Sequence, residues 1–172
     1  MIKKKVCMLG AFAAGKTSLV QRYVHSIFSE KYHTTVGVKI EKAEVQLEDT
    51  TMDLIIWDLH GEDDFQHVRL SYLKGSSGCI YVVDGTRENT LATALNLKKI
   101  VEKTIGKVPF ILIVNKLDLQ EQWEISPLML QNIQKDGAIV IKTSAKTGKE
   151  VKEAFQLLAK KMVDKKLDKK AG

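Results

Sequence analysis

The sequence predicts an α/β domain built on a doubly wound, six-stranded, mostly parallel sheet, with helices on both faces and one antiparallel edge strand. Short apolar runs rich in β-formers alternate along the 172 residues with segments of helical periodicity, which is typical of repeated strand–helix–strand units. The runs at 79–84 and 109–115 are apolar almost throughout, as strands buried on both faces should be. The length suits a single domain.

Each element follows from its local pattern. The apolar run 6–10 is the first strand, and 16–24 is a helix because Leu19, Val20 and Tyr23 share one face. The strands at 36–47 and 51–58 are joined only by residues 48–50, so they must form an antiparallel hairpin. The remaining elements are a short helix near 65–74, a strand at 79–84, a helix near 89–104, a strand at 109–115, a helix near 126–135, a strand at 138–144 and a final helix from about Lys149.

The net charge of +6 is concentrated at the two ends of the chain. The three lysines at 3–5 contribute +3, and residues 160–170 contribute +4 because their six lysines are partly offset by Asp164 and Asp168, which leaves residues 6–159 with a net charge of −1. A nucleic-acid-binding domain is expected to carry its positive charge on a folded face, so we expect no nucleic-acid partner. We divide the chain into a folded domain at 1–164 and a flexible basic tail at 165–172.

Nothing in the composition predicts a membrane span or a disulfide. No apolar run approaches the roughly 18 residues that a bilayer span requires. Cys7 and Cys79 sit in apolar runs and are expected to be core thiols in a reducing compartment. No cysteine follows Cys79, so the ending offers no lipid attachment site. We expect a cytoplasmic monomer with at most weak electrostatic contact to membranes.

Residues 10–17, GAFAAGKT, match the phosphate-loop pattern between a predicted strand and a predicted helix. Gly10 and Gly15 permit a tight turn, so that backbone N–H groups can approach phosphate oxygens. Lys16 would place a positive charge beside the terminal phosphates, and the Thr17 hydroxyl is a hard oxygen ligand suited to Mg²⁺. By itself, this loop indicates only a nucleoside triphosphate.

Two further loops at predicted strand ends indicate which base is bound. Asp118, in the segment NKLD at 115–118, can only accept hydrogen bonds. Guanine offers two adjacent donors and adenine presents an acceptor, so Asp118 favours guanine. In SAK at 144–146, a backbone N–H can donate to guanine O6. The alternative of an ATP-using phosphate-loop kinase would need an arginine-bearing lid, but the chain has three arginines and no lid insertion.

With these motifs the chain resembles the Ras superfamily of small GTPases over residues 3–163. The segments TVGV at 35–38, WDLHGEDDF at 57–65 and SYLKGSSG at 71–78 are most like the Rab branch. The resemblance implies the phosphate-loop G-domain fold and a switch that binds GTP or GDP with Mg²⁺ and hydrolyses GTP slowly. It also implies that effector, exchange and activating proteins bind through residues near 27–40 and 59–74.

The resemblance assigns roles to particular residues. Lys16, Gly61 and Glu62 would serve hydrolysis. Asp58 would hold a metal-bound water, and Thr17 and Thr35 would complete the Mg²⁺ site. Phe28 would lie against guanine, with core packing as its alternative role. The expected nucleotide-binding residues are Gly10, Ala13, Ala14, Gly15, Lys16, Thr17, Ser18, Phe28, Thr35, Gly61, Asn115, Lys116, Asp118, Ser144, Ala145 and Lys146.

Two positions depart from the family pattern. Glu62 stands where the family usually has a water-orienting Gln, and Phe12 stands where a small residue usually lies beside the γ-phosphate. We therefore expect weak intrinsic hydrolysis and a poor response to arginine-bearing activators. The alternative is a GTP-binding scaffold with negligible hydrolysis. His60 could compensate for Glu62 or be an exposed loop histidine, and Arg69 could act as an arginine in cis or form a surface salt bridge.

Apolar residues surround the two predicted switch loops. Rab-type members read their partners through three aromatic positions, of which Trp57 and Tyr72 match two, while Ile40 replaces the third. Such a patch suits effector binding, and ordinary core packing is the alternative. The residues concerned are Ile27, Val36, Val38, Trp57, Phe65, Val68, Tyr72 and Leu73.

Overall fold

The computed structural model describes residues 1–31, 35, 37–61 and 67–170, with only the backbone for 165–170. Over these ranges the chain forms one six-stranded sheet of order β2-β3-β1-β4-β5-β6. The strands are β1 (Ile2–Gly10), β2 (Val38–Gln46), β3 (Thr51–Leu59), β4 (Gly78–Asp84), β5 (Phe110–Asn115) and β6 (Val140–Lys142). The α-helices are α1 (Lys16–His25), α2 (Asn89–Ile105), α3 (Pro127–Lys135) and α4 (Val151–Lys170), and the 3-10 turns are η1 (Leu70–Leu73) and η2 (Leu117–Gln122).

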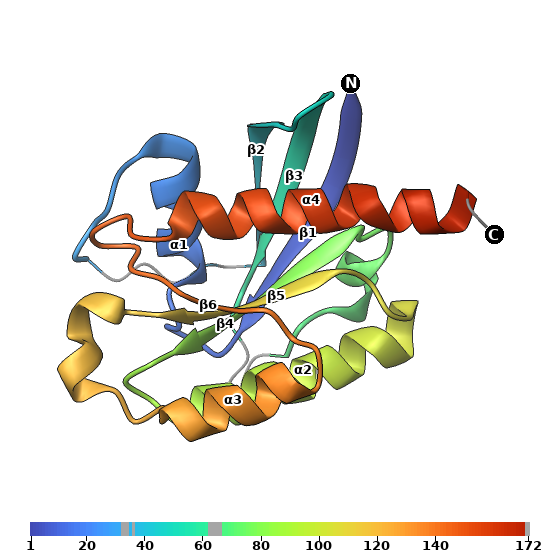
Figure 1. Cartoon of the computed structure of the whole chain (residues 1–172). Coiled ribbons are helices and arrows are strands. Elements are labelled where there is room, and N and C mark those ends of the chain that lie inside the picture. The colour runs from blue at the N-terminus through green and yellow to red at the C-terminus, as the bar shows by residue number, and fades with distance from the viewer. Residues whose placement is uncertain (32–34, 36, 62–66, 171–172) are drawn as a thin grey trace.

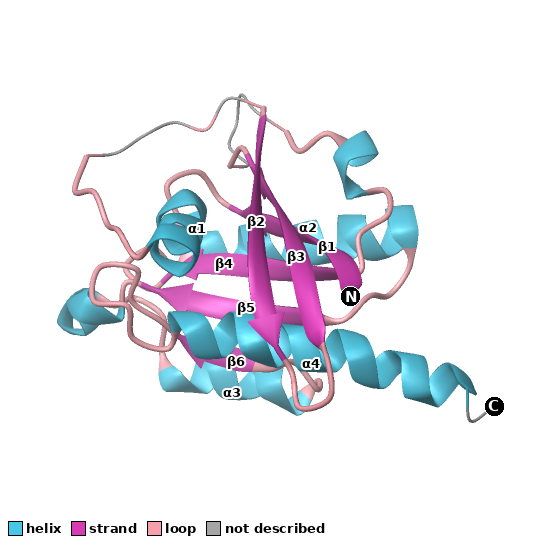
Figure 2. Cartoon of the chain, turned by 90° about the horizontal axis from the view of Figure 1, so that it is seen from above, coloured by secondary structure: helices cyan, strands magenta, loops and turns pink. Residues whose placement is uncertain are grey.

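The strand pairing confirms the predicted fold class. The edge strand β2 runs antiparallel to β3, with Val38 opposite Leu59, and the other pairings are parallel. Strand β1 lies between β3 and β4. The chain therefore adds β2 and β3 on one side of β1, and then adds β4, β5 and β6 on the other side. Ligands of doubly wound sheets bind at this reversal point. Figure 2 shows the twist that carries β2 and β3 across the direction of β4 and β5.

Alternate residues of each central strand face opposite layers of helices. Val6 and Met8 of β1 lie in the core under α1 and α4, where Phe155 packs. Their neighbours Cys7 and Leu9 lie in the core beneath α2 and α3. Figure 1 shows α1 and α4 on one side of the sheet and α2 and α3 on the other. This two-residue alternation explains the continuous apolar runs, and Cys7 and Cys79 are fully buried as predicted.

Several element boundaries differ from the prediction. Strand β1 begins at Ile2 because Lys3–Lys5 pair with residues 53–55 of β3, so these lysines are part of the sheet. The helix predicted near 65–74 is wrong over 67–69, because the described helical turn is η1 at Leu70–Leu73, and 62–66 fall outside the described residues. Strand β6 is shorter than predicted, and the turn η2 was not anticipated.

Helix α4 continues in the backbone to Lys170. The division of the chain at residue 164, with a flexible tail after it, stays a prediction. Within the described ranges, no helix has both the length and the apolar character needed to cross a bilayer.

Candidate functional site

A cavity of about 380 Å³ lies at the carboxyl edge of the sheet, where the loops after β1, β5 and β6 meet. Most of the predicted binding residues line it: Ala13, Gly15, Lys16, Thr17, Ser18, Phe28, Thr35, Gly61, Asn115, Lys116, Asp118, Ala145 and Lys146. The other predicted binding residues that the structure describes are buried and are not part of this lining: Gly10, Ala14, Asp58 and Ser144. Glu62 lies outside the described residues. One cavity therefore collects residues from segments that are more than 130 positions apart in the sequence.

The backbone of the phosphate loop is shaped by close approaches that require glycine. Gly15 has a φ of 103°, and a Cβ there would lie 2.2 Å from the Asn115 side-chain nitrogen. A Cβ on Gly61 would lie 2.4 Å from the Cα of Phe12, so the loop after β3 packs directly on the phosphate loop. Ala13 is held in the left-handed region with a φ of 60°, a strained conformation that is typical of ligand-binding loops.

Lys16 is a buried cation inside this loop, with only 5% of its surface exposed. Its Nζ donates to the carbonyls of Ala11 at 2.8 Å and Gly10 at 3.3 Å. Burial lowers the pKa of Lys16 to about 8, with Asp58 opposing the shift and Arg87 adding to it. A buried ammonium group that is bonded to neutral carbonyls favours an anion close by, and a phosphate group supplies one.

Three oxygen-bearing side chains converge next to Lys16. Thr17 Oγ1 donates to Asp58 Oδ2 at 2.7 Å and lies 2.7 Å from Thr35 Oγ1. Asp58 is buried, and its Oδ1 has no hydrogen-bond partner among the described residues. Burial raises the pKa of Asp58, while Thr17 and Lys16 oppose that shift. An all-oxygen set with an orphaned buried carboxylate oxygen fits a hard divalent cation such as Mg²⁺.

At the other end of the cavity, Asp118 is held by the loop after β6. Ser144 Oγ donates to Asp118 Oδ1 at 2.7 Å and accepts from the Thr147 amide at 3.1 Å. Asp118 is exposed, whereas Ser144 is 1% exposed. The serine is therefore packed inside the fold and sets the direction of a carboxylate that lines the cavity.

Asn115 joins the loops at both ends of the cavity. Its Nδ2 donates to Ala14 O at 3.3 Å, and its Oδ1 accepts from Thr143 Oγ1 at 3.1 Å and from the Ala145 amide at 3.2 Å. Since the Ala145 amide is already bonded, a base oxygen would share it with Asn115 or use another amide of this loop. Asn115 is 2% exposed, so it ties the loops together from beneath.

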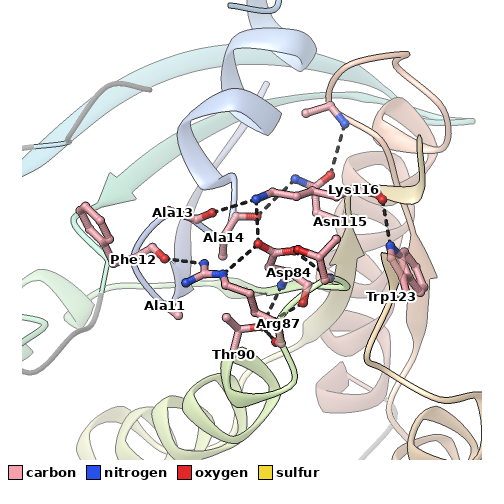
Figure 3. A network of polar contacts seen from close by, with 12 residues as sticks. Ala11, Phe12, Ala13, Ala14, Asp84, Arg87, Thr90, Asn115, Lys116 and Trp123 are labelled. Carbon is pink, nitrogen blue, oxygen red and sulfur yellow. Dashed lines mark hydrogen bonds and ion pairs between the residues drawn. The ribbon is translucent and has the colours of Figure 1, made fainter. Parts of the chain in front are cut away.

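Behind the phosphate loop lies a charged cluster that the sequence analysis missed. Asp84 Oδ2 accepts from Lys116 Nζ at 2.7 Å and from Arg87 Nε at 3.0 Å, as Figure 3 shows. Its Oδ1 accepts from the amide and hydroxyl of Thr86. Burial acts to raise the pKa of Asp84, but these bonds from Lys116, Thr86 and Arg87 hold it below its ordinary value. The position of Asp84, at the end of an apolar strand, was the available clue.

Arg22 braces the other end of the cavity and was also missed. Its Nε donates to Ala145 O at 2.8 Å, and its Nη2 donates to Lys146 O. It therefore links α1 to the loop that follows β6. Nothing in the sequence around Arg22 indicated this contact, because the two segments are 123 residues apart.

The structure corrects one interpretation near the switch loops and adds a contact for a second residue, Arg69. His60 is not an exposed loop histidine: it is 9% exposed, with Nε2 2.7 Å from His67 O and Nδ1 3.4 Å from Gly37 O. It therefore connects the start of β2 to the segment after β3. The guanidinium of Arg69 lies over the Tyr72 ring, 5.9 Å from its centroid; it is not among the residues that line the cavity, and whether it pairs with the acidic residues at 62–64 lies outside the described residues.

The apolar residues around the switch loops divide into core and surface. Leu73 is fully buried, whereas Ile27, Ile40 and Leu70 are at least half exposed. Trp57 and Tyr72 pack against each other with ring centroids 6.0 Å apart, and both pack on the core cluster under α2. Val36 and Phe65 lie outside the described residues.

Lys5 contacts both Trp57 and Tyr72 and holds them in place. Its Nζ lies 3.5 Å from the centroid of the Trp57 ring and donates to Tyr72 O at 2.6 Å. A cation on the face of an indole ring is attracted by the quadrupole of the ring. The two aromatic residues are thus part of the fold and also border the exposed Ile40, which pairs with Trp57 across the hairpin.

Comparison with known proteins agrees with this geometry. The sequence matches the model of the Ras family over residues 5–164. It is 35% identical over 166 residues to Ras-related protein Rab-7b of Bos taurus, covering 94% of this chain and 82% of the relative. It is 34% identical to Ras-related protein Rab-21 of Geodia cydonium (95% and 72% covered) and to Ras-related protein RABG3f of Arabidopsis thaliana (91% and 80% covered).

Proposed function

Because the chain belongs to the Ras family and is similar to Rab proteins, we propose that it is a guanine-nucleotide switch that binds GTP or GDP with Mg²⁺ and hydrolyses GTP slowly. The resemblance inferred from the sequence motifs is confirmed at the level of the family. That this chain binds GTP or GDP, that it holds Mg²⁺ and that it hydrolyses GTP slowly are what we propose.

The observation that carries the proposal is the juxtaposition of a phosphate cradle and an oriented carboxylate in one cavity. The cradle is the loop around Lys16, and the carboxylate is Asp118, held by Ser144 at 2.7 Å. A carboxylate that is already directed by a serine can accept from the N1–H and 2-amino group of guanine, whereas adenine would leave it facing an acceptor. Base selection and triphosphate binding therefore follow from one site.

Hydrolysis would require this chain to hold the γ-phosphate and a water in line. Lys16 would neutralise charge on the terminal phosphates, and the Gly61 amide, packed beside Phe12, would donate to the γ-phosphate. Thr17, Thr35 and the water-binding Asp58 would hold Mg²⁺, which offsets the charge that develops on the phosphate oxygens. Glu62 would orient the attacking water, but a carboxylate beside the γ-phosphate is less suited to this than an amide.

The base specificity can be tested with one substitution. The wild-type protein is expected to bind GTP and GDP and not ATP. In Asp118→Asn, the amide would accept from N1–H and donate to the 2-oxo group of xanthine, so the preference should move from GTP to XTP. Asp136→Asn, at the exposed carboxyl end of α3, is the matched control. Equal binding of ATP and GTP by the wild type, or an unchanged preference in Asp118→Asn, would contradict the proposal.

A GTP-binding scaffold with negligible hydrolysis is the second candidate, and the position of Phe12 favours it. Phe12 lines the cavity, where its ring would stand in the way of an arginine from an activating protein. Single-turnover hydrolysis should be faster in Phe12→Gly and Glu62→Gln than in the wild type. If neither variant hydrolyses GTP faster than the wild type, then Phe12 and Glu62 are not the cause of slow hydrolysis. If the wild type releases no phosphate over hours, the scaffold function is favoured.

Partner binding would use the residues near 27–40 and 59–74. His60 joins these two segments through Gly37 and His67, so a change in one can reach the other. Loss of γ-phosphate contacts at Thr35 and Gly61 would release both, which is how nucleotide switches act on partners. The cytoplasmic location and the monomeric state stay predictions.

A further inference from the structure

The carbonyl side of the phosphate loop is held by side chains from distant elements. Arg87 Nη2 donates to Phe12 O at 2.7 Å, Lys116 Nζ donates to Ala13 O at 3.4 Å, and Asn115 Nδ2 donates to Ala14 O at 3.3 Å. Figure 3 shows these donors reaching the loop from the segment after β4 and from the end of β5 and the residue that follows it. Three consecutive carbonyls of the loop therefore accept hydrogen bonds from side chains of other elements, and of the three donor residues Arg87 is the one that does not line the cavity.

These contacts fix the direction of the amides that face the cavity. A trans peptide is planar, with its C=O and N–H pointing in opposite directions. A donor that holds the carbonyl of Phe12 therefore sets the direction of the N–H of Ala13, which lines the cavity. The left-handed φ of 60° at Ala13 needs such a restraint, because residues with a Cβ rarely adopt this conformation.

Arg87 suits this task because its guanidinium is a rigid fork. Its Nε donates to the buried Asp84 at 3.0 Å while its Nη2 reaches Phe12 O. Asp84 is fully buried and also accepts a hydrogen bond from Lys116, so it anchors the guanidinium group of Arg87 at a fixed position. A lysine at this position would keep the charge but could not span both acceptors with one ammonium group.

We propose that Arg87 is a positioning residue for diphosphate recognition, which holds the peptide between Phe12 and Ala13 so that its N–H points at the phosphates. The inference rests on the proposed function. Arg87 acts on the back of the loop, and its effect reaches the ligand only through that peptide. Arg87 should therefore contribute to the binding of nucleotides with two or three phosphates, but not to recognition of the base.

Arg22 offers a matched comparison within the same protein. It donates to the carbonyls of Ala145 and Lys146, so it braces the base-reading loop in the way that Arg87 braces the phosphate loop. The two arginines should have separable effects. Removing Arg22 should lower the affinities for guanosine, GMP and GDP by one common factor, whereas removing Arg87 should lower the affinities for GDP and GTP alone.

The test is competition binding of guanosine, GMP, GDP and GTP by the wild type, Arg87→Ala, Arg87→Lys and Arg22→Ala. We expect both Arg87 variants to lose about tenfold in GDP and GTP affinity, the effect of one lost charge-assisted hydrogen bond, with GMP and guanosine unchanged. Phosphorus NMR of bound GDP should show a displaced β-phosphate resonance in both. If Arg87→Ala does not fold, Arg87→Lys, which keeps the stem and the charge, decides the question.

The outcomes separate the inference from the proposed function. Failure of the wild type to bind GDP would remove the proposed function. Full GDP affinity in Arg87→Lys would show that only the charge matters, and equal losses for GMP and GDP would show general loosening of the site. Either result would overturn the role assigned to Arg87.

Discussion

Ser144→Ala should weaken the choice between guanine and adenine while leaving the phosphate cradle intact. The Ser144 hydroxyl donates to Asp118 Oδ1 at 2.7 Å and accepts from the Thr147 amide, so the substitution releases the carboxylate from the fold. Hydrogen bonds to charged groups contribute about 1.5–3 kcal/mol. Because Asp118 is exposed, the lower end applies, which corresponds to about a tenfold loss in the GTP-to-ATP affinity ratio.

The assay is competition of GTP and ATP against a fluorescent GDP analogue, with inorganic triphosphate as a probe of the cradle. Ser144→Thr, which keeps a hydroxyl at the same carbon, should retain most of the discrimination. Triphosphate should bind Ser144→Ala as it binds the wild type, because Lys16 and the phosphate loop are unchanged. An unaltered GTP-to-ATP ratio in Ser144→Ala would refute the idea that the serine directs Asp118.

Three further predictions concern the core, the thiols and the metal. Phe155→Ala removes a fully buried ring whose centroid lies 4.0 Å from that of Tyr23. The substitution should lower the free energy of unfolding by about 3–5 kcal/mol and the Tm, measured by circular dichroism, by about 10 °C. A fall in Tm of less than about 3 °C would contradict this packing. Burial raises the pKa of Cys79 to about 12, so iodoacetamide near pH 8 should modify it only in denaturant; rapid reaction of the native protein would be the contrary result. EDTA should speed GDP release from the wild type but have no added effect on Thr17→Ala, and equal acceleration in both would argue against a metal at Thr17.

The strand and helix pattern of this protein could be predicted because it depends on local periodicity. The alternation of Val6 and Met8 with Cys7 and Leu9 between two cores is visible in the sequence as an apolar run bounded by a glycine. The phosphate loop, Asp118 and Ser144 were found for a related reason. They follow predicted strands, and the ends of parallel strands meet at one edge of the sheet.

The boundaries that depend on pairing were less predictable. The first strand was predicted to begin at residue 6, but pairing with β3 places Lys3–Lys5 in β1. One of the two roles considered for His60 was that of an exposed loop histidine, whereas the folded chain buries it with its ring nitrogens near Gly37 O and His67 O. In both cases a partner far along the chain decides the environment, and no local pattern records that partner.

By itself, the sequence determined the class of fold, the order of its elements and which residues are expected to bind a triphosphate and select a base. Only the tertiary structure decided which side chains hold those residues in place. Arg22 and Arg87 are ordinary surface arginines in the sequence, yet each bonds carbonyls of a loop more than 70 residues away. Such contacts depend on where the packed sheet brings distant backbone carbonyls, because a carbonyl acceptor is present at every residue and its exposure to a donor is a property of the folded chain.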